Sequence, residues 1–588
     1  MVNEISWKIG GEAGYGIDTS GQAFARCCSR GGLNVRTVSE YPSLIRGGHN
    51  TFHVTASEGD LQSPKKELDM LVCLNKETVD RHYKQVKKGG IIVYDADEVK
   101  IETAKYRSDV EWFSVPLLAI TVELKIDKVM RNTVAVGASI GLLDYDIEIL
   151  RDMMGKKFAK KGESVISANL GAIDKGYEYV KKNYKGNFKA KLKKCTGPCA
   201  RPLLNGNDAL SIGAIKAGCK FISAYPMTPA TSVMINLASV EKEYSIVVKQ
   251  TEDEIAAVNM TIGASIAGAR AMTATSGGGF SLMVEGLSLA GATETPIVIV
   301  LAQRPGPSTG LPTWTEQSDL KFALHGGQGE FARILIAPGD HEECFWAGVE
   351  SFNLTEKWQC PVIILTDKHL ADGFSTVNID ESKAKIDRGL LMTDAQAAKE
   401  TDYKRYEFTA NGVSKRAVPG MVNFMHVAVG DEHEEHGRIN EDEGNRTDMS
   451  DKRNKKLNFI LKELPEPKLY GPENAEITLI SWGSCKGPVL EAMKELEAQG
   501  IKANFLHYIY VWPLKTEKLV KLMDKAKKTV VIENNKTAQL GALISEVIAK
   551  QVKYKVLKYN GRQFYPSEIT EKVKEIAKNG KETELVVR

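Results

Sequence analysis

The feature that constrains the fold most is a run of six apolar residues, most of them β-branched, at positions 297–302 (Ile-Val-Ile-Val-Leu-Ala). A short run of this kind is typical of a central parallel strand whose two faces are both covered by helices. Similar runs alternate with helical patterns along most of the chain, as they do in open α/β sheets. We therefore expect an α/β protein, and its 588 residues are enough for about four domains.

Two charged segments divide the alternating pattern into three stretches. Residues 181–194 contain seven lysines and no apolar period, which predicts a solvated connector. Residues 431–456 hold nine acidic and six basic residues without a helical or strand period, which predicts a surface excursion. The prediction is three open α/β domains in tandem, at 1–185, 201–430 and 471–588, joined by a basic linker at 186–200 and a charged linker at 431–470.

The expected elements follow from β-branched runs and from the helical spacing of apolar residues. The first stretch predicts strands at 5–11, 71–74 and 91–94 and a helix at 18–30. The second predicts strands at 220–225, 245–249, 271–275 and 297–302 and helices at 209–217, 254–269 and 281–290. The third predicts strands at 477–481 and 529–533 and helices at 487–499 and 540–548.

Charge and hydropathy argue against two kinds of partner. The 78 basic and 75 acidic residues leave a net charge of +3, too small for a basic face that binds nucleic acid. No stretch approaches the roughly 18 apolar residues of a membrane span, and the first residues lack the pattern of a secretory signal. We expect a cytoplasmic protein that binds neither nucleic acid nor a membrane.

Two residue pairs have the spacing of metal ligands. Cys195 and Cys199 are two of nine scattered cysteines, an odd number that favours reduced thiols over a disulfide framework. His433 and His436 enclose two glutamates within the second charged segment. Because the sequence places no third ligand beside either pair, we expect simple thiols and an exposed polar loop.

The loop at 10–16 (Gly-Gly-Glu-Ala-Gly-Tyr-Gly) follows a predicted strand and precedes a helix, where backbone N–H groups can approach a phosphate. Gly11, Gly14 and Gly16 reverse the usual dinucleotide-binding spacing, and the acidic ribose partner is not evident. A tight structural turn and an anion site therefore both remain open. Arg46 could add a positive charge to the same edge.

Thr228 lies in the next such loop, within the sequence Tyr-Pro-Met-Thr-Pro at 225–229. The two prolines fix φ on either side of Met227-Thr228, which is stiffer than a connector needs. Capping of the following helix by Thr228 or Thr231 is the simpler explanation, and from this loop alone we favour the cap.

Three further strand-end loops carry candidate residues. Glu254 begins the buried face of a helix, Ser276 precedes a glycine turn that could pass a cofactor at close range, and Arg304 offers a planar donor fork suited to a carboxylate. The helix dipole accounts for the neighbouring Glu252 and Asp253, and structural pairing with a nearby acid is the alternative for Arg304. Together with Thr228, these residues follow strands of one predicted sheet, so we expect all four at a single edge.

These motifs resemble the α subunit of 2-oxoacid:ferredoxin oxidoreductases. The resemblance rests on residues 225–229, on Glu254 with Gly263 nine residues later, on Thr-Ser-Gly at 275–277, and on Gln-Arg-Pro-Gly-Pro-Ser-Thr-Gly-Leu-Pro-Thr at 303–313. It implies a thiamine diphosphate pyrimidine-binding domain in the second stretch. Three positions in the inferred pocket depart from the residues that the family more often has: Met227, Ala230 and Pro305.

The flanking stretches resemble other parts of that family. Residues 10–16 and 45–49 (Ile-Arg-Gly-Gly-His) look like its γ subunit, here fused in front. Residues 481–487 (Ser-Trp-Gly-Ser-Cys-Lys-Gly) and 530–535 (Val-Val-Ile-Glu-Asn-Asn) are similar to its transketolase C-terminal-like domain. The resemblance covers nearly the whole chain.

The resemblance also implies roles for the strand-end residues. Glu254 would exchange a proton with N1′ of thiamine diphosphate, with Ser276 and Gly277 as further cofactor contacts. Thr228 would hydrogen-bond the substrate, and Arg304 would hold its carboxylate. The resemblance also implies residues on the coenzyme A side of the site: Gly14, Tyr15, Gly16 and Arg46.

One family pattern is absent from this sequence. Gly59-Asp60, Gly339-Asp340 and Gly430-Asp431 are not completed by a second glycine, so the Gly-Asp-Gly motif that binds the diphosphate through Mg²⁺ is missing. The sequence also lacks a C-x-x-C-x-x-C cluster for iron–sulfur ligation. We expect a β subunit that carries Mg²⁺, the diphosphate site and a [4Fe–4S] cluster, in an αβ or (αβ)₂ assembly that reduces ferredoxin.

The expected reaction is the reversible oxidative decarboxylation of a 2-oxoacid to acyl-CoA and CO₂, with 2-oxoglutarate favoured. Pyruvate or a branched or aromatic 2-oxoacid is the alternative substrate. A non-catalytic scaffold subunit and a nicotinamide-dependent oxidoreductase that uses the first glycine loop are the alternative functions; the presence of Glu254 argues against the scaffold.

Overall fold

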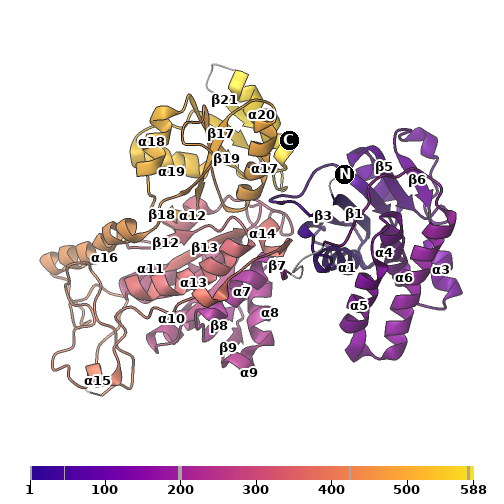
Figure 1. Ribbon diagram of the computed structural model, residues 1–588. Helices are drawn as coiled ribbons and strands as arrows, with labels where there is room; N and C mark the ends of the chain where they lie inside the picture. Colours follow the sequence, from indigo (N-terminus) through magenta and orange to yellow (C-terminus); the bar gives the residue numbers. More distant parts are fainter. Residues whose placement is uncertain (1–2, 45–46, 196–200, 423–424, 579–582) are drawn as a thin grey trace. The chain divides into compact units, whose positions relative to one another are not determined.

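The computed structural model describes residues 3–44, 47–195, 201–422, 425–578 and 583–588. The chain divides into two compact units, one of Met1–Leu204 with Asp372–Asn378 and one of Asn205–Ala371 with Ile379–Arg588. The first unit holds an eight-stranded sheet, and the second holds a seven-stranded and a six-stranded sheet (Figure 1). The predicted fold class, three α/β sheets in tandem, is confirmed.

The first unit is a mixed sheet of order β6-β5-β4-β1-β3-β2-β14-β7. Trp7 of β1 is fully buried, stacks on Phe24 of α1 with ring centroids 4.3 Å apart, and donates to Ser139 Oγ of α4 over 3.0 Å. Its strands are β1 Glu4–Glu12, β2 Asn34–Glu40, β3 His49–Ser57, β4 Leu68–Cys73, β5 Val86–Tyr94, β6 Glu111–Ser114, β7 Leu203–Asn205 and β14 Phe374–Thr376; its helices are α1 Ile17–Arg30, α2 Lys76–His82, α3 Leu117–Glu123, α4 Arg131–Leu142, α5 Ile147–Phe158 and α6 Glu163–Asn183.

The seven-stranded sheet has the order β18-β12-β13-β11-β10-β8-β9, and only the edge strand β18 runs antiparallel to its neighbour. β11 is the fourth strand and is buried along its whole length, so the prediction of a central parallel strand at 297–302 is confirmed. The elements are β8 Phe221–Ala224, β9 Val247–Gln250, β10 Ala271–Thr275, β11 Val298–Gln303, β12 Ile334–Ile336, β13 Val362–Asp367, β18 Tyr510–Trp512, α7 Gly206–Lys216, α8 Thr231–Ser239, α9 Glu241–Tyr244, α10 Glu254–Ile266, α11 Gly277–Ala292, α12 Leu320–His325, α13 His341–Trp358 and α15 Asp394–Ala397.

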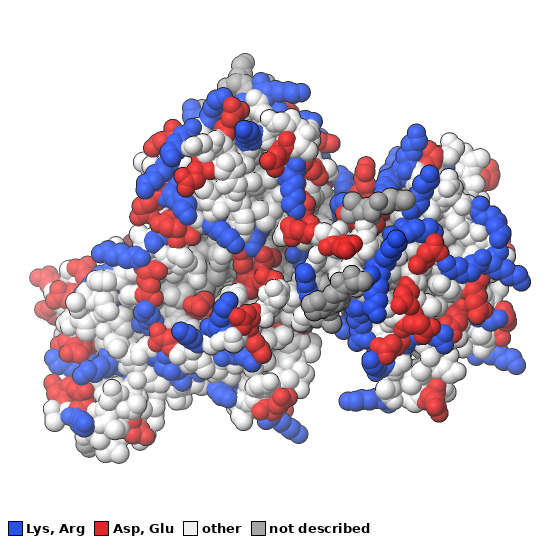
Figure 2. Space-filling view, in the orientation of Figure 1, with Lys and Arg blue, Asp and Glu red and all other residues white. Residues whose placement is uncertain are grey.

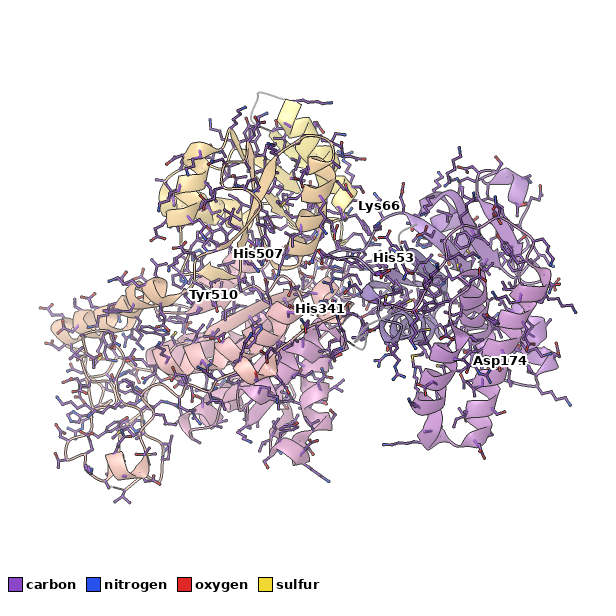
Figure 3. All side chains as sticks on the ribbon, in the orientation of Figure 1. His53, Lys66, Asp174, His341, His507 and Tyr510 are labelled. Atoms are coloured by element: carbon purple, nitrogen blue, oxygen red, sulfur yellow. The ribbon has the colours of Figure 1, made fainter. Side chains whose placement is uncertain are left out.

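The six-stranded sheet has the order β15-β17-β16-β19-β20-β21 and shares one hydrophobic core with the seven-stranded sheet. An ion cluster also joins the two: Lys486 of α17 pairs with Asp340, the N-cap of α13, and with Glu343 in the first turn of that helix. His507 of β17, labelled in Figure 3, lies with its Nε2 3.0 Å from Glu343 Oε2. The elements are β15 Lys468–Tyr470, β16 Ile477–Trp482, β17 Ala503–Tyr508, β19 Lys528–Glu533, β20 Tyr554–Leu557, β21 Thr583–Val586, α17 Lys486–Glu497, α18 Glu517–Lys525, α19 Gln539–Ile548 and α20 Pro566–Lys578.

The prediction of a solvated connector at 181–194 is wrong. α6 continues to Asn183, and Phe188 and Leu192 are buried in the core of the first unit. The Leu192 N–H also donates to the Leu143 carbonyl oxygen over 3.0 Å. Over residues 188–193 apolar residues alternate with lysines, so Phe188 and Leu192 pack inward while Lys189 and Lys193 are exposed. The end of this linker, residues 196–200, lies outside the described residues.

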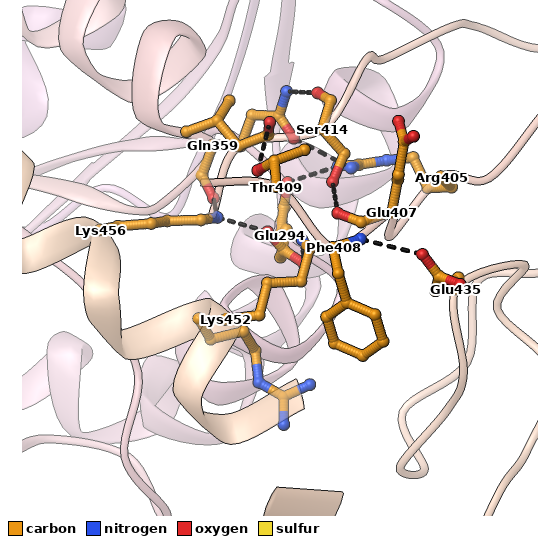
Figure 4. Close-up of polar contacts among 12 residues, drawn as sticks. Glu294, Gln359, Arg405, Glu407, Phe408, Thr409, Ser414, Glu435, Lys452 and Lys456 are labelled. Atoms are coloured by element: carbon orange, nitrogen blue, oxygen red, sulfur yellow. Dashed lines mark hydrogen bonds and ion pairs between the residues drawn. The ribbon is translucent and has the colours of Figure 1, made fainter. Parts of the chain in front are cut away.

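The prediction of a surface excursion at 431–456 is also wrong. A long helix, α16 Glu443–Glu463, occupies much of it, and Lys452 and Lys456 are buried against Glu294 (Figure 4). Lys456 Nζ also donates to the Gln359 carbonyl oxygen over 3.2 Å, and Arg405 donates to the Gln359 side chain over 2.9 Å. The helix is anchored by ion pairs instead of an apolar stripe, so hydrophobic periodicity does not reveal it.

On the face shown in Figure 2, acidic and basic side chains are interspersed. Among the described helices, none is both long enough and apolar enough to cross a bilayer.

Candidate active site

The strand ends of the seven-stranded sheet bring the four predicted residues to one edge. β8, β9, β10 and β11 run parallel, so their carboxyl ends share that edge. Thr228 follows β8, Glu254 begins the helix after β9, Ser276 directly follows β10 and Arg304 directly follows β11. The common edge expected from the sequence is therefore present in the structure.

Glu254 is the first residue of α10, whose N-cap Asp253 accepts a hydrogen bond from the Ala256 N–H over 2.8 Å. The Glu254 side chain is only 2% exposed, and its Oε1 has no hydrogen-bond partner. Burial raises the pKa of the Glu254 carboxyl above its ordinary value. A buried carboxyl without a partner is costly unless a ligand completes it, so Glu254 is suited to bind a group that shares a proton with it.

Glycine at 279 makes room for this carboxyl. A Cβ added to Gly279 would lie 2.2 Å from Glu254 Oε1 and 2.1 Å from Thr275 Oγ1. Ser276, the N-cap of α11, is fully buried, and its hydroxyl makes no cap bond and has no partner. Two polar atoms without hydrogen-bond partners, Glu254 Oε1 and Ser276 Oγ, therefore lie at the start of α11.

Arg304 reaches across the edge to the loop after β8. Its Nη1 donates to the Thr228 carbonyl oxygen over 2.8 Å. The prediction that Thr228 or Thr231 caps α8 is wrong, because the helix begins at Thr231 and its N-cap is Ala230, without a side-chain cap bond. The Thr228 side chain is therefore not committed to the helix.

Two carboxyls near this edge, those of Asp319 and Glu316, are not predicted from the sequence. Asp319 lies beside Gly277: a Cβ added there would lie 2.7 Å from Asp319 Oδ2, which is buried and has no partner. Burial raises the pKa of Asp319 to about 6, although the charge of Arg304 acts in the opposite direction. Burial likewise raises the pKa of Glu316 to about 7. Glu316 lies in an irregular loop and Asp319 is the N-cap residue of the short helix α12, so no periodicity could have revealed either residue.

The glycine loop at 10–16 belongs to the first unit. Gly14 and Gly16 have φ of 93° and 68°, and Gly16 is the N-cap of α1. Asn132 Nδ2 donates to the carbonyl oxygens of Tyr15 and Gly16 over 2.8 and 3.3 Å, and the Arg131 guanidinium lies 4.1 Å from the centre of the Tyr15 ring. These contacts account for the loop as a structural turn. Arg46 lies outside the described residues.

The candidate metal pairs have different outcomes. His433 is fully buried against Tyr406, so the prediction that it lies in an exposed loop is wrong. His436 instead lies 2.9 Å from both Asp402 and Glu434 carboxylates. Cys199 lies outside the described residues. Within the described part of the chain, no group of three or more His, Cys, Asp or Glu residues could hold a metal ion.

Protein-family comparisons match the chain in three consecutive parts. The family described as pyruvate ferredoxin/flavodoxin oxidoreductase matches residues 6–179, and the thiamine diphosphate-binding family of pyruvate flavodoxin/ferredoxin oxidoreductases matches 212–451. The transketolase C-terminal domain family matches 470–578. The fold and these matches define an oxidoreductase chain that contains a domain of the thiamine diphosphate-binding type.

Relatives extend over the whole chain. The α subunit of a 2-oxoacid:ferredoxin oxidoreductase from Sulfolobus sp is 36% identical over 98% of this chain and 97% of its own length. A solved 2-oxoglutarate:ferredoxin oxidoreductase from Magnetococcus marinus, with 2-oxoglutarate, coenzyme A and succinyl-CoA bound, is 35% identical with a TM-score of 0.92, covering 98% of this chain and 100% of that one. The 2-oxoglutarate synthase subunit KorA of Methanothermobacter marburgensis is 33% identical over 63% of this chain and 97% of its own length. This chain belongs to the family of 2-oxoacid:ferredoxin oxidoreductase α subunits.

Proposed function

We propose that this chain binds the pyrimidine ring of thiamine diphosphate and the carboxylate of a 2-oxoacid, as one subunit of a complex. The complex oxidatively decarboxylates that 2-oxoacid to acyl-CoA and CO₂ and passes the electrons to ferredoxin. The observation that carries the proposal is the buried Glu254 carboxyl, whose Oε1 has no hydrogen-bond partner, at the sheet edge that Arg304 also reaches.

Glu254 fits the cofactor because its Oε1 is buried and has no hydrogen-bond partner, so a ligand that shares a proton with it would satisfy this oxygen. We assign it to N1′ of the pyrimidine ring, where a buried carboxyl with a raised pKa is suited to share a proton with the ring nitrogen. Bound there, thiamine diphosphate would supply a nucleophilic carbon and an acceptor for the electrons of decarboxylation, while Glu254 would hold the pyrimidine ring. Ser276 and Gly277 border the same space, and the Ser276 hydroxyl is unsatisfied.

Arg304 and Thr228 would hold the substrate. The guanidinium binds the carboxylate next to the 2-oxo group, and the Thr228 hydroxyl hydrogen-bonds the substrate beside it. We favour 2-oxoglutarate, because the Magnetococcus marinus relative carries 2-oxoglutarate and succinyl-CoA. Pyruvate or a branched or aromatic 2-oxoacid is the alternative, since the Sulfolobus relative is named only as a 2-oxoacid enzyme.

The remaining parts of the reaction would come from partners. A β subunit would bring Mg²⁺, the diphosphate site and a [4Fe–4S] cluster, in an αβ or (αβ)₂ assembly, and ferredoxin would take the electrons. Support comes from the sequence, which lacks a completed Gly-Asp-Gly motif. Coenzyme A would accept the acyl group, with Gly14, Tyr15, Gly16 and Arg46 on its side. We place the complex in the cytoplasm.

The test is steady-state kinetics of the purified complex over a panel of 2-oxoacids, with coenzyme A and ferredoxin supplied. The proposal predicts thiamine-dependent turnover, highest kcat/KM for 2-oxoglutarate and no turnover by the isolated chain. Turnover by the isolated chain would contradict the shared site. Full activity of a complex containing Glu254→Gln would favour the scaffold alternative. Turnover that requires a nicotinamide cofactor would show that the nicotinamide, and not ferredoxin, accepts the electrons.

A further inference from the structure

The candidate site contains the carboxylate of Asp319, to which the proposed function assigns no role. Its main-chain N–H donates to the Gln303 side chain over 2.9 Å, which holds it at the same strand end as Arg304. Its carboxylate lies against the first turn of α11, where the absence of a side chain on Gly277 leaves room for it. Oδ2 is buried and has no hydrogen-bond partner. The fold therefore keeps an unsatisfied carboxylate at the substrate edge.

The charges around Asp319 are few. Arg304 follows Gln303, the residue that binds the Asp319 N–H, and the charges of Arg304 and Asp319 act on each other. Glu316, from the same loop as Asp319, contributes a second negative group. The first turn of α11, residues 277–280, carries no ionisable side chain. Arg304 is thus the counter-charge of Asp319 in the free site.

We propose that Asp319 is a positioning residue that competes with the carboxylate of the 2-oxoacid for Arg304, so that the site takes up the substrate together with one proton. This inference rests on the proposed function, because it requires Arg304 to hold the substrate. One guanidinium does not neutralise two carboxylates in a buried site, and like charges there force one of them to protonate. The carboxyl of a 2-oxoacid is the stronger acid, so Asp319 takes the proton.

The proton balance of the cycle is simple. A proton from solvent adds to Asp319 Oδ2 as the substrate binds, and no substrate bond changes in that step. The burial that raises the pKa of Asp319 to about 6 makes this uptake accessible near neutral pH. Decarboxylation then removes the substrate's carboxylate as CO₂. Asp319 returns its proton to solvent and becomes the counter-charge of Arg304 again.

The test is the pH dependence of KM for the preferred 2-oxoacid, measured with the intact holoenzyme complex from about pH 5.5 to about pH 8. In the wild type, KM should be constant below the pKa of Asp319 and rise by up to about tenfold per pH unit above it. Asp319→Asn should give a flat KM that is roughly tenfold or more below the wild-type value at about pH 8. A flat wild-type profile, or a rise that persists in Asp319→Asn, would overturn the inference.

Glu316→Gln is the matched control, because Glu316 lies three residues away and burial also raises its pKa, to about 7. It should keep the wild-type profile; if it alone flattens the profile, Glu316 takes the proton and the inference is wrong. A KM that rises at every pH in Asp319→Asn would show that Asp319 aids binding, which also overturns it. Asp319→Ser serves the same test if the amide variant fails to fold.

Arg304→Lys separates this inference from the proposed function. If Arg304→Lys leaves the KM of the 2-oxoacid unchanged, Arg304 does not hold the substrate. Both the proposed role of Arg304 and the inference about Asp319 are then wrong. If it raises that KM while Asp319→Asn keeps the wild-type pH profile, only the inference about Asp319 falls.

Discussion

The guanidinium of Arg304 donates from Nη1 to the main-chain carbonyl oxygen of Thr228, 2.8 Å away. The bond joins the loop after β11 to the loop after β8, across β10, which lies between these strands. It uses one of the five N–H donors of the guanidinium and fixes the side chain at the sheet edge. The two residues that the proposal assigns to the substrate are therefore already in contact.

Arg304→Lys keeps the charge but loses the planar fork and its geometry at Thr228. We expect kcat/KM for the 2-oxoacid to fall by roughly tenfold or more, as for a loss above about 1.4 kcal/mol, while KM for coenzyme A stays unchanged. Arg151→Lys, at a side chain that is 40% exposed in the first unit, is the control and should match the wild type. A change confined to the coenzyme A constant would assign Arg304 to the acyl acceptor instead.

Gly279→Ala places a methyl group against the Glu254 carboxyl and should destabilise the chain by about 1–3 kcal/mol through overpacking. Gly278→Ala is a matched control one residue earlier in α11, where an added Cβ meets nothing within 4 Å. It should leave the chain as stable as the wild type or more stable by up to about 1 kcal/mol, since alanine favours a helix. Thermal unfolding compares the two; equal losses would show that Gly279 is not a packing requirement.

Glu294→Gln should be more damaging than Lys452→Met. The first leaves two buried lysines without their counter-charge, at a cost of about 3–5 kcal/mol, whereas the second leaves the pair of Glu294 and Lys456 intact. Lys455→Met, at a partly exposed position of the same helix, is the control. The order of the unfolding midpoints checks this, and a Lys452→Met variant as unstable as Glu294→Gln would contradict it.

The same ion cluster has a defined pH dependence. Burial acts to raise the pKa of Glu294, but the charges of Lys452, Lys456 and Arg405 outweigh it and hold the pKa well below its usual range. Because the folded-state pKa is depressed, the stabilisation is present at neutral pH and is lost as the pH falls through that folded value. The deficit of Glu294→Gln should therefore shrink as the pH falls into strong acid, as unfolding midpoints measured against pH would show.

Periodicity and the position of loops after strands were enough to predict three α/β sheets and the edge where Thr228, Glu254, Ser276 and Arg304 meet. They did not predict the antiparallel strands β2 and β3 of the first unit. An apolar run such as 297–302 identifies a buried strand by its composition, and parallel strands bring their following loops together. The roles of these residues stay predictions, because geometry alone does not show what binds.

Other features required the folded structure. α16 has no apolar stripe, because Lys452 and Lys456 reach the interior through ion pairs with a residue more than 150 positions away. Asp319 is the N-cap residue of α12, and only the packing of Gly277 against it reveals its place at the site. Long-range pairing of this kind leaves no local pattern in the sequence.

The most direct test of the central claim is hydrogen–deuterium exchange at C2 of thiamine diphosphate in the assembled complex, compared between the wild type and Glu254→Gln. Loss of the proton relay predicts exchange slower by about 10²- to 10⁴-fold, with the complex still assembled. Glu252→Gln, at an exposed carboxyl two residues earlier, should exchange at the wild-type rate. An unchanged rate in Glu254→Gln would contradict the account, and slowing in Glu252→Gln would move the catalytic carboxyl there.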